Sequence, residues 1–129
     1  EKKAFPGMWT VPGGGLSTDD YSGTPPTTSD GLQWYNTVEK TLRREIMEEV
    51  GIEIEKPKYL LDLTFIRPDN VPVLVLSYFC KYKSGEVDIS KEPDTVEYAW
   101  ATLDELRTYN LIPGIFEEIE MVDKILKER

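Results

Sequence analysis

The residues best suited to chemistry are three glutamates that lie close together in one predicted helix, Glu45, Glu48 and Glu49. At roughly 100° per residue, their i, i+3 and i+4 spacing brings the three carboxylates to one side of the helix. Glu49 falls within the arc of the apolar stripe and Glu45 borders it, so both point partly toward the core. The stripe consists of Val38, Leu42, Ile46 and Val50.

Elementary electrostatics opposes such a cluster, because like charges at these spacings repel and partial burial increases the cost. A hard divalent cation with oxygen ligands resolves the conflict, and Mg²⁺ or Mn²⁺ is the natural choice. The alternative is an acidic, solvated helix face, which is the commoner explanation for clustered glutamates in general. The inward placement here favours a metal site.

The elements that hold this cluster can be predicted from local signals. Residues 8–12 predict a short strand that ends at Gly13-Gly14-Gly15. The helix is predicted over 37–50, with Asn36 as its N-cap, Glu39 completing a capping box and Gly51 as its left-handed stop.

The second half of the chain predicts a sheet and two helices. Residues 59–66 and 71–82 are rich in β-branched, aromatic and aliphatic residues and flank a turn, so they predict an antiparallel pair. Residues 96–101 predict a further strand. Thr102 and Glu105 predict a capping box for a helix over 104–109, and a last helix follows Pro113-Gly114. Its expected buried side is Ile115, Phe116, Ile119, Val122 and Ile125.

The composition of the chain disfavours several classes of function. The chain has 129 residues, enough for one domain, and a net charge of −9 with no segregated basic patch, which disfavours a nucleic acid polymer as partner. No apolar run is long enough to span a membrane. Histidine is absent, so acid–base or metal chemistry must come mostly from carboxylates. The one cysteine, Cys80, lies in an apolar run, which predicts a small buried apolar residue. A single cysteine forms no intrachain disulfide, which fits a cytoplasmic location.

Residues 44–52, Arg-Glu-Ile-Met-Glu-Glu-Val-Gly-Ile, match the second half of the Nudix hydrolase signature: Gly, five residues, Glu, seven residues, then R-E-U-x-E-E-x-G-U, with U aliphatic. Residues 7–14 and 96–106 resemble the family's flanking elements. There are two departures. The interval between Gly14 and the helix is longer by about sixteen residues, and Asn36 stands eight positions before Arg44, where the family has its first Glu.

The resemblance, to the MutT-like Nudix hydrolases, implies a single α/β domain over 1–129. Its fold would be a Nudix-type α/β/α sandwich with a mixed β-sheet, the family's N-terminal strand missing. It implies a metal-dependent hydrolase that cleaves the diphosphate linkage of a nucleoside diphosphate derivative or of a nucleoside triphosphate, oxidised or not. The substrate would be a small nucleotide-like molecule and the cofactor Mg²⁺ or Mn²⁺. Many family members are homodimers, and the resemblance leaves the oligomeric state of this chain open.

The resemblance also assigns roles to individual residues. Glu45, Glu48 and Glu49 would bind the metal, joined by a backbone carbonyl of Gly13 or Gly14. Glu92 matches a further ligand by its spacing to Glu97, or it is a plain surface glutamate. Glu45 or a loop glutamate would accept a proton from water, and Arg44 would orient a carboxylate of the cluster.

Two other activities share this fold. A non-catalytic Nudix domain that senses a nucleotide typically loses glutamates of the signature, whereas all three are present here. Isopentenyl diphosphate isomerase uses a catalytic cysteine and a histidine-rich metal site, and this chain has no histidine. The sequence therefore favours the hydrolase.

An inserted loop at about residues 18–35 joins the glycine turn to the helix. It contains Tyr21, Trp34 and Tyr35, whose rings could stack on a nucleobase, and Pro25-Pro26 stiffens its middle. Two interpretations stay open: a lid or wall of the substrate pocket, or a tolerated surface excursion.

Overall fold

The structure is a computed structural model and describes residues 7–128. The described chain forms two compact units, each built from separated segments. One, here the site unit, comprises residues 12–57 and 80–98; the other, the hairpin unit, comprises residues 7–11, 58–79 and 99–128. Every carboxylate of the predicted cluster belongs to the site unit.

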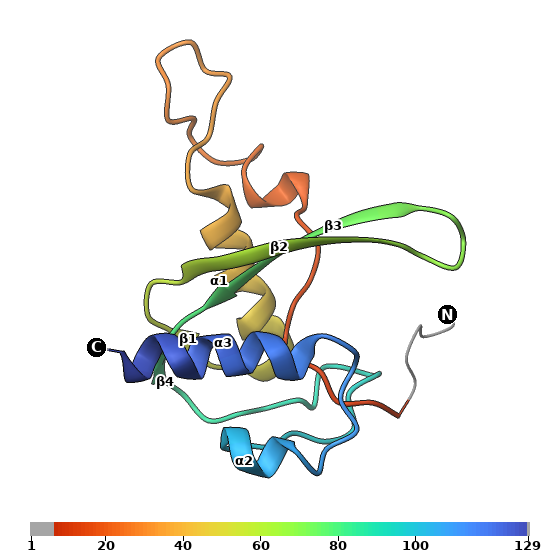
Figure 1. Ribbon diagram of the computed structural model, residues 1–129. Coiled ribbons are helices and arrows are strands. Elements are labelled where there is room, and N and C mark those ends of the chain that lie inside the picture. Colours follow the sequence, from red (N-terminus) through yellow and green to blue (C-terminus); the bar gives the residue numbers. More distant parts are fainter. Residues whose placement is uncertain (1–6, 129) are drawn as a thin grey trace. The chain divides into compact units, whose positions relative to one another are not determined.

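The site unit is organised around helix α1, Thr37–Val50, which has the bounds predicted from the sequence (Figure 1). Gly51 ends it with a φ of 72°, and its N–H donates to the carbonyls of Ile46 and Met47. This left-handed stop confirms the prediction, since glycine adopts positive φ without a Cβ penalty. A short 3-10 helix, η1 (Thr18–Asp20), precedes α1 in the chain.

Asn36 is the N-cap residue of α1, as predicted, but the predicted capping box with Glu39 is wrong. Asn36 itself adopts a left-handed conformation, with a φ of 62°, and its side chain makes no capping hydrogen bond. Asparagine tolerates this conformation better than most residues. Here that tolerance lets the chain turn from the long loop into the helix, and the carbonyl of Asn36 accepts from the N–H of Lys40 at 3.3 Å.

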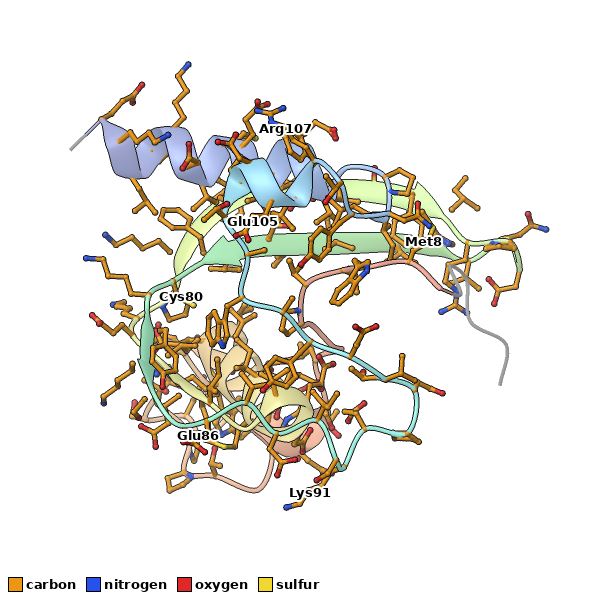
Figure 2. The ribbon with its side chains drawn as sticks, turned by 90° about the horizontal axis from the view of Figure 1, so that it is seen from below. Met8, Cys80, Glu86, Lys91, Glu105 and Arg107 are labelled. Atoms are coloured by element: carbon orange, nitrogen blue, oxygen red, sulfur yellow. The ribbon has the colours of Figure 1, made fainter. Side chains whose placement is uncertain are left out.

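Two short antiparallel strands complete the regular structure of the site unit, β1 (Glu53–Ile54) and β4 (Tyr82–Ser84). Ile54 is buried, with 4% of its surface exposed, and its carbonyl accepts a hydrogen bond from Arg43 of α1 at 2.7 Å. This bond ties α1 to the strand pair. Cys80, which was expected inside one long strand, instead lies between β3 and β4 and is exposed (Figure 2).

The hairpin unit contains the antiparallel pair β2 (Lys58–Ile66) and β3 (Pro72–Phe79), as predicted. The turn between them is closed by hydrogen bonds from Arg67 N–H to Val71 and from Asn70 N–H to Arg67. Helix α2 (Leu103–Leu106) begins with the predicted capping box, in which Thr102 and Glu105 bond reciprocally at 2.8 and 3.2 Å.

Helix α3 (Ile115–Lys127) is the last element of the hairpin unit. The five residues expected on its buried side are all half-buried, whereas Glu117, Glu120 and Lys124 are exposed. The guanidinium of Arg107, at the end of α2, lies 5.1 Å from the ring centre of Phe116. None of the described helices combines the length and apolar character that a membrane span requires.

Two predicted strands are not strands in the structure. The segment 8–12 forms a single parallel bridge, Trp9 to Leu111, and residues 96–101 are irregular. Among residues 7–128 the strands therefore pair antiparallel, and the parallel part of the predicted mixed sheet is this one bridge. The strand over residues 96–101 was predicted from its apolar residues alone, but a strand also needs a hydrogen-bonding partner along its length.

Gly51 provides a test of how α1 is terminated. A Cβ at this position would carry left-handed strain and come within 3.3 Å of the Asp88 Cβ. Gly51→Ala should therefore lower the free energy of unfolding by at least about 1–2 kcal/mol in urea denaturation. Gly51→Asn should cost less, and Gly23→Ala, at an open site without positive φ, should stay within about 0.5 kcal/mol. Equal stability of Gly51→Ala and Gly23→Ala would contradict this account.

Candidate active site

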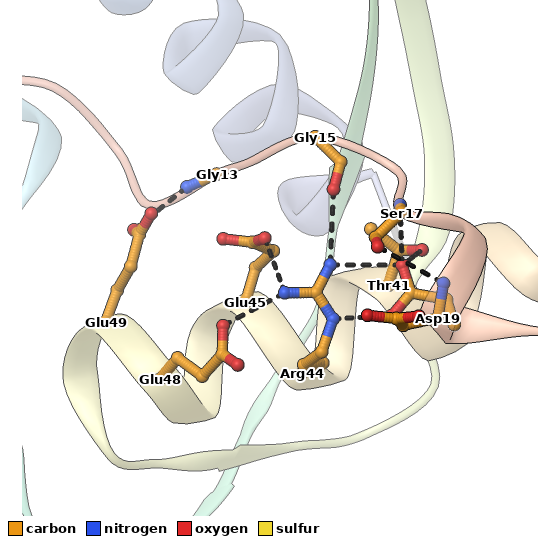
Figure 3. A network of polar contacts seen from close by, with 10 residues as sticks. Gly13, Gly15, Ser17, Asp19, Thr41, Arg44, Glu45, Glu48 and Glu49 are labelled. Carbon is orange, nitrogen blue, oxygen red and sulfur yellow. Dashed lines mark hydrogen bonds and ion pairs between the residues drawn. The ribbon is translucent and has the colours of Figure 1, made fainter.

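The candidate site lies where the C-terminal half of α1 meets the glycine turn Gly13–Gly15 (Figure 3). Both segments belong to the site unit. The helix presents Glu45, Glu48 and Glu49 toward or beside the turn, as the helical spacing predicted. Two direct contacts fix the turn against these side chains.

The first contact depends on the absence of a side chain at Gly14. The carboxylate of Glu45 lies so close to the Gly14 backbone that a Cβ there would be 2.0 Å from Glu45 Oε2. The second contact is a hydrogen bond from the Gly13 N–H to Glu49 Oε2 at 3.2 Å. Gly13 was predicted to offer its carbonyl to a metal; in the structure its N–H contacts the cluster.

Arg44 is the cation at the centre of the site. Its Nη1 donates to Glu45 Oε1 at 2.7 Å and to Glu48 Oε2 at 2.9 Å. Its Nη2 donates to the Gly15 carbonyl at 3.2 Å. The prediction that Arg44 orients a carboxylate of the cluster remains a proposal about function, but the contacts it requires are present.

Asp20 is the partner of Arg44 that the sequence analysis missed. It accepts from Arg44 Nε at 2.5 Å and from Nη2 at 3.0 Å, a two-pronged pair. The Thr41 hydroxyl and the Ser17 N–H donate to its Oδ2 at 2.7 and 3.0 Å. The Arg44 bonds, then Thr41 and Ser17, hold the pKa of the Asp20 carboxyl well below its usual range, although its side chain is only 3% exposed.

These contacts correct the comparison with the signature. Asn36 is exposed and has no side-chain contact with Arg44 among the hydrogen bonds of the described chain. Five residues separate Gly14 from Asp20, and the family pattern has five residues between its Gly and its first Glu. Asp20 therefore stands in the position of that Glu. The extra residues therefore come after this position and not before it. Counting forward from Gly14, and accepting Asp for Glu, would have found Asp20 in the sequence.

Glu49 carries the electrostatic strain of the cluster. Burial raises the pKa of its carboxyl, the Gly13 hydrogen bond opposes this, and repulsion from Glu45, Glu92 and Glu48 raises it further. Glu92 lies in the irregular segment after β4, which Figure 2 marks with Glu86 and Lys91. Its effect on Glu49 shows that this segment brings a fourth carboxylate within electrostatic range of the helix.

The side chains of the cluster offer oxygen atoms only, the donor type that Mg²⁺ and Mn²⁺ prefer. One guanidinium faces Asp20, Glu45 and Glu48, so two negative charges stay uncompensated before Glu49 and Glu92 are considered. In residues 7–128, however, no three acidic side chains already converge as metal ligands. The chemistry of the residues fits a divalent cation, and their side chains would have to turn toward it.

The three aromatic residues of the inserted loop have different surroundings. Tyr21 and Trp34 pack on each other, with ring centres 5.3 Å apart, and Trp34 Nε1 donates to the Thr24 carbonyl at 2.9 Å. Tyr35 is 60% exposed. The loop extends beyond the N-terminal end of α1 (Figure 1).

The strain on Glu49 predicts a pH-dependent gain in stability for Glu49→Gln in metal-free buffer. The carboxyl is charged above its raised pKa, and folding then bears the cost of burial and repulsion. Below its ordinary value of 4.5 the group is protonated in both states and the cost vanishes. The free energy of unfolding of Glu49→Gln should therefore exceed that of wild type by about 0.5 kcal/mol at pH 7–8, and this gain should disappear below pH 4.5.

Urea denaturation across pH 4–8 measures this difference. The control is Glu55→Gln, which removes an exposed carboxylate of the site unit outside the cluster. A constant offset at every pH, or a gain equal to that of the control, would refute the assignment of strain to Glu49.

Comparison with known proteins identifies the family. A model of the NUDIX domain matches residues 1–124. Nucleoside triphosphatases NudI from Klebsiella pneumoniae (strain 342) and Enterobacter sp. (strain 638) are each 26% identical over 121 residues, covering 86% of this chain and 73% of the relative. A crystal structure of a MutT NUDIX hydrolase from Burkholderia pseudomallei is similar with a TM-score of 0.57 and 30% identity over 71% of each chain, which confirms the predicted Nudix-type α/β fold. The chain therefore belongs to the NUDIX family and is a pyrophosphohydrolase.

Proposed function

We propose that the protein hydrolyses a phosphoanhydride bond of nucleoside triphosphates and requires Mg²⁺ or Mn²⁺. The observation that carries this proposal is that Glu45, Glu48 and Glu49 lie together beside the Gly13–Gly15 segment, with one guanidinium paired to two of them, so that their charges repel one another. A divalent cation relieves that repulsion, and the phosphate oxygens of a substrate add further ligands of the same type. The similarity to proteins named nucleoside triphosphatase supports the substrate class.

In this proposal the metal-binding groups are Glu45, Glu48, Glu49 and Glu92, with the Gly13 carbonyl as a backbone ligand. When bound, the cation neutralises phosphate charge and makes phosphorus easier to attack. The residues of the chain supply orientation. Arg44 restrains Glu45 and Glu48 by one oxygen each, which limits the positions their carboxylates can take.

Glu45 is the proposed general base. Its side chain is 17% exposed and lies against the Gly14 backbone, so the carboxylate is shielded from solvent while one edge faces the turn. It accepts a proton from the attacking water as the water oxygen bonds to phosphorus and the bridging anhydride oxygen leaves. The products are two phosphate-bearing molecules, and their identity reports which anhydride bond breaks.

The direct test is hydrolysis of a panel of ribo- and deoxyribonucleoside triphosphates with millimolar Mg²⁺, with products separated by chromatography. Glu48→Gln and Glu49→Gln should each lose at least about 100-fold in kcat/KM while remaining folded, because each removes a metal ligand. Glu39→Gln is the matched control, since Glu39 lies on the same helix but pairs with Arg43 instead.

Mn²⁺ titration by calorimetry gives a second readout that does not depend on turnover. Wild type and Glu39→Gln should bind Mn²⁺, and the two cluster variants should bind it more weakly. Near-normal turnover of both cluster variants in Mg²⁺ would refute the metal site. Nucleotide binding without any product would indicate a sensing domain in place of an enzyme.

We also propose that Tyr21, Trp34 and Tyr35, at the base of the inserted loop, contact the nucleoside end of the substrate. Asn36, where the loop enters α1, lies nine residues before Glu45, which is about 14 Å along a helix. An extended nucleoside triphosphate spans a comparable length. Tyr21 and Trp34 already pack on each other, and Tyr35, the next residue after Trp34, is exposed, so two of the three rings are in contact before a base arrives.

Tyr35→Ala should raise KM about tenfold or more with kcat little changed, because stacking of a base on an aromatic ring contributes about 1–3 kcal/mol. Leu32→Ala is the control, since Leu32 is an exposed apolar residue of the same loop, 74% exposed against 60% for Tyr35. A loop variant with residues 22–33 replaced by a short Gly-Ser link keeps Asp20 and tests the remainder. Unchanged KM values in Tyr35→Ala and in the loop variant would show that the loop is a tolerated surface excursion without a role in substrate binding.

A further inference from the structure

We infer that Asp88 is a positioning residue, whose side chain folds the segment after β4 against the C-terminal end of α1 and so keeps Glu92 beside the glutamates of that helix. This inference rests on the proposed function, since it assigns Glu92 to the metal. It concerns a side chain outside the nine-residue match, in the irregular segment that runs past α1 between Glu86 and Lys91 (Figure 2).

Electrostatics alone would drive Glu92 away from α1. Burial raises the pKa of the Glu49 carboxyl, and repulsion from nearby carboxylates, that of Glu92 among them, raises it further. Glu49 lies in the last turn of α1, where the partial negative charge of the helix end adds to the repulsion. The Glu92 side chain is nevertheless half-buried. Another interaction must therefore hold its segment against the helix.

A backbone contact joins this segment to the end of α1. The N–H of Asp88 donates to the carbonyl of Val50 at 2.8 Å. This carbonyl is one of the last four of the helix, which have no partner within the helix itself. The backbones also come close here, since a Cβ on Gly51 would lie 3.3 Å from the Asp88 Cβ, and a Cβ on Gly85 would lie 3.1 Å from the Gly51 carbonyl oxygen. Asp88 is therefore fixed against the helix by its backbone.

The side chain of Asp88 then turns the chain toward Glu92. Its Oδ1 accepts from the Ser90 N–H at 2.9 Å, an Asx turn in which the carboxylate takes the place of a backbone carbonyl. The Ile89 carbonyl accepts from the Glu92 N–H at 3.1 Å. Three successive hydrogen bonds thus lead from Val50 to Glu92, and only the middle one depends on a side chain. Substitution of that side chain can open the turn and leave the backbone contact in place.

The turn matters for metal binding because Glu92 lies on a segment without regular secondary structure. Each residue that becomes fixed when a cation binds costs conformational entropy. A turn that is already closed removes part of this cost before the cation arrives. Opening the turn should therefore weaken the cation through Glu92, while the three glutamates of α1 keep their positions.

Mn²⁺ titration by calorimetry on the whole protein tests this. Asp88→Ala removes the acceptor and should raise the Mn²⁺ Kd at least about tenfold, the lower end of the effect of losing a group that orients a metal ligand. Asp88→Asn is the matched control, because it removes the same charge but keeps an oxygen that can accept from Ser90. Asp88 is exposed and its charge is screened, so Asp88→Asn should keep nearly the wild-type Kd.

Asp88→Ser provides an intermediate variant, because a serine hydroxyl forms the same kind of turn more weakly. Its Mn²⁺ Kd should fall between those of Asp88→Asn and Asp88→Ala. It also carries the test if Asp88→Ala does not fold.

Limited digestion with trypsin examines the same turn without metal. Lys91 is exposed and directly precedes Glu92, so the bond between them is a potential cleavage site whose cutting requires the turn to open locally. Asp88→Ala should be cut there faster than wild type in metal-free buffer, and Asp88→Asn at the wild-type rate. Cleavage after Arg107, in the hairpin unit, is the internal reference and should not change.

A double-mutant cycle shows whether Asp88 acts through Glu92. Glu92→Gln should itself raise the Mn²⁺ Kd by at least as much as Asp88→Ala, because it removes the proposed ligand. In the Glu92→Gln background, Asp88→Ala should cause no further loss of affinity, since the turn then has no ligand to position.

The outcomes distinguish this inference from the function on which it rests. Wild-type protein that binds no Mn²⁺ overturns the proposed metal site and this inference with it. A wild-type Kd for Glu92→Gln, equal Kd values for Asp88→Ala and Asp88→Asn, or a further loss in the double variant overturns only the role of Asp88. A lower melting temperature of Asp88→Ala with an unchanged Kd would make Asp88 purely structural.

Discussion

The rest of the site depends on one constraint: a single guanidinium must satisfy more carboxylates than its charge can neutralise. Arg44 contacts Asp20, Glu45 and Glu48, and Glu49 lies beyond its reach, where burial and repulsion destabilise its charged form. Arginine suits this position because its five donors point in fixed directions, whereas a lysine ammonium would act as a point charge. The network therefore fixes orientation while leaving the region negative, which is the condition that a divalent cation requires.

The glycine turn is the second consequence of this constraint. A carboxylate that packs against backbone needs a position without a side chain, and Gly14 is where the Glu45 carboxylate comes closest. Gly13 adds an N–H donor to Glu49, and Gly15 adds a carbonyl acceptor for Arg44. Each glycine thus meets a different group of the cluster, and the turn acts as a polar wall of the site. A turn with larger residues would push Glu45 away from the guanidinium that orients it.

Much of the fold could be predicted from the sequence, because the residues that determine these elements act on their near neighbours. The bounds of α1, its stop at Gly51, the β2–β3 hairpin and the Thr102–Glu105 capping box follow from periodicity and from residues that act on their near neighbours. The features that could not be read depend on distant partners. Residues 96–101 have strand composition but no ladder, and Asn36 has cap composition but adopts the left-handed conformation. Asp20 was missed because its partner lies twenty-four residues away and the spacing was counted backward from the helix.

The position of the inserted loop gives a physical reason for the long spacing between Asp20 and Arg44. The extra residues follow Asp20 and precede α1, so both members of the Asp20–Arg44 pair stay anchored however long the loop becomes. The entropic cost of closing a longer loop grows only slowly with its length, and Asp20 and Trp34, at its two ends, are held by hydrogen bonds. The polar network is thereby insulated from changes in the loop, whose hydrogen bonds, such as those from Thr27 to Gln33 and from Trp34 to Thr24, are largely internal. Such an arrangement lets the loop change in length and sequence while the carboxylates and their arginine keep one geometry.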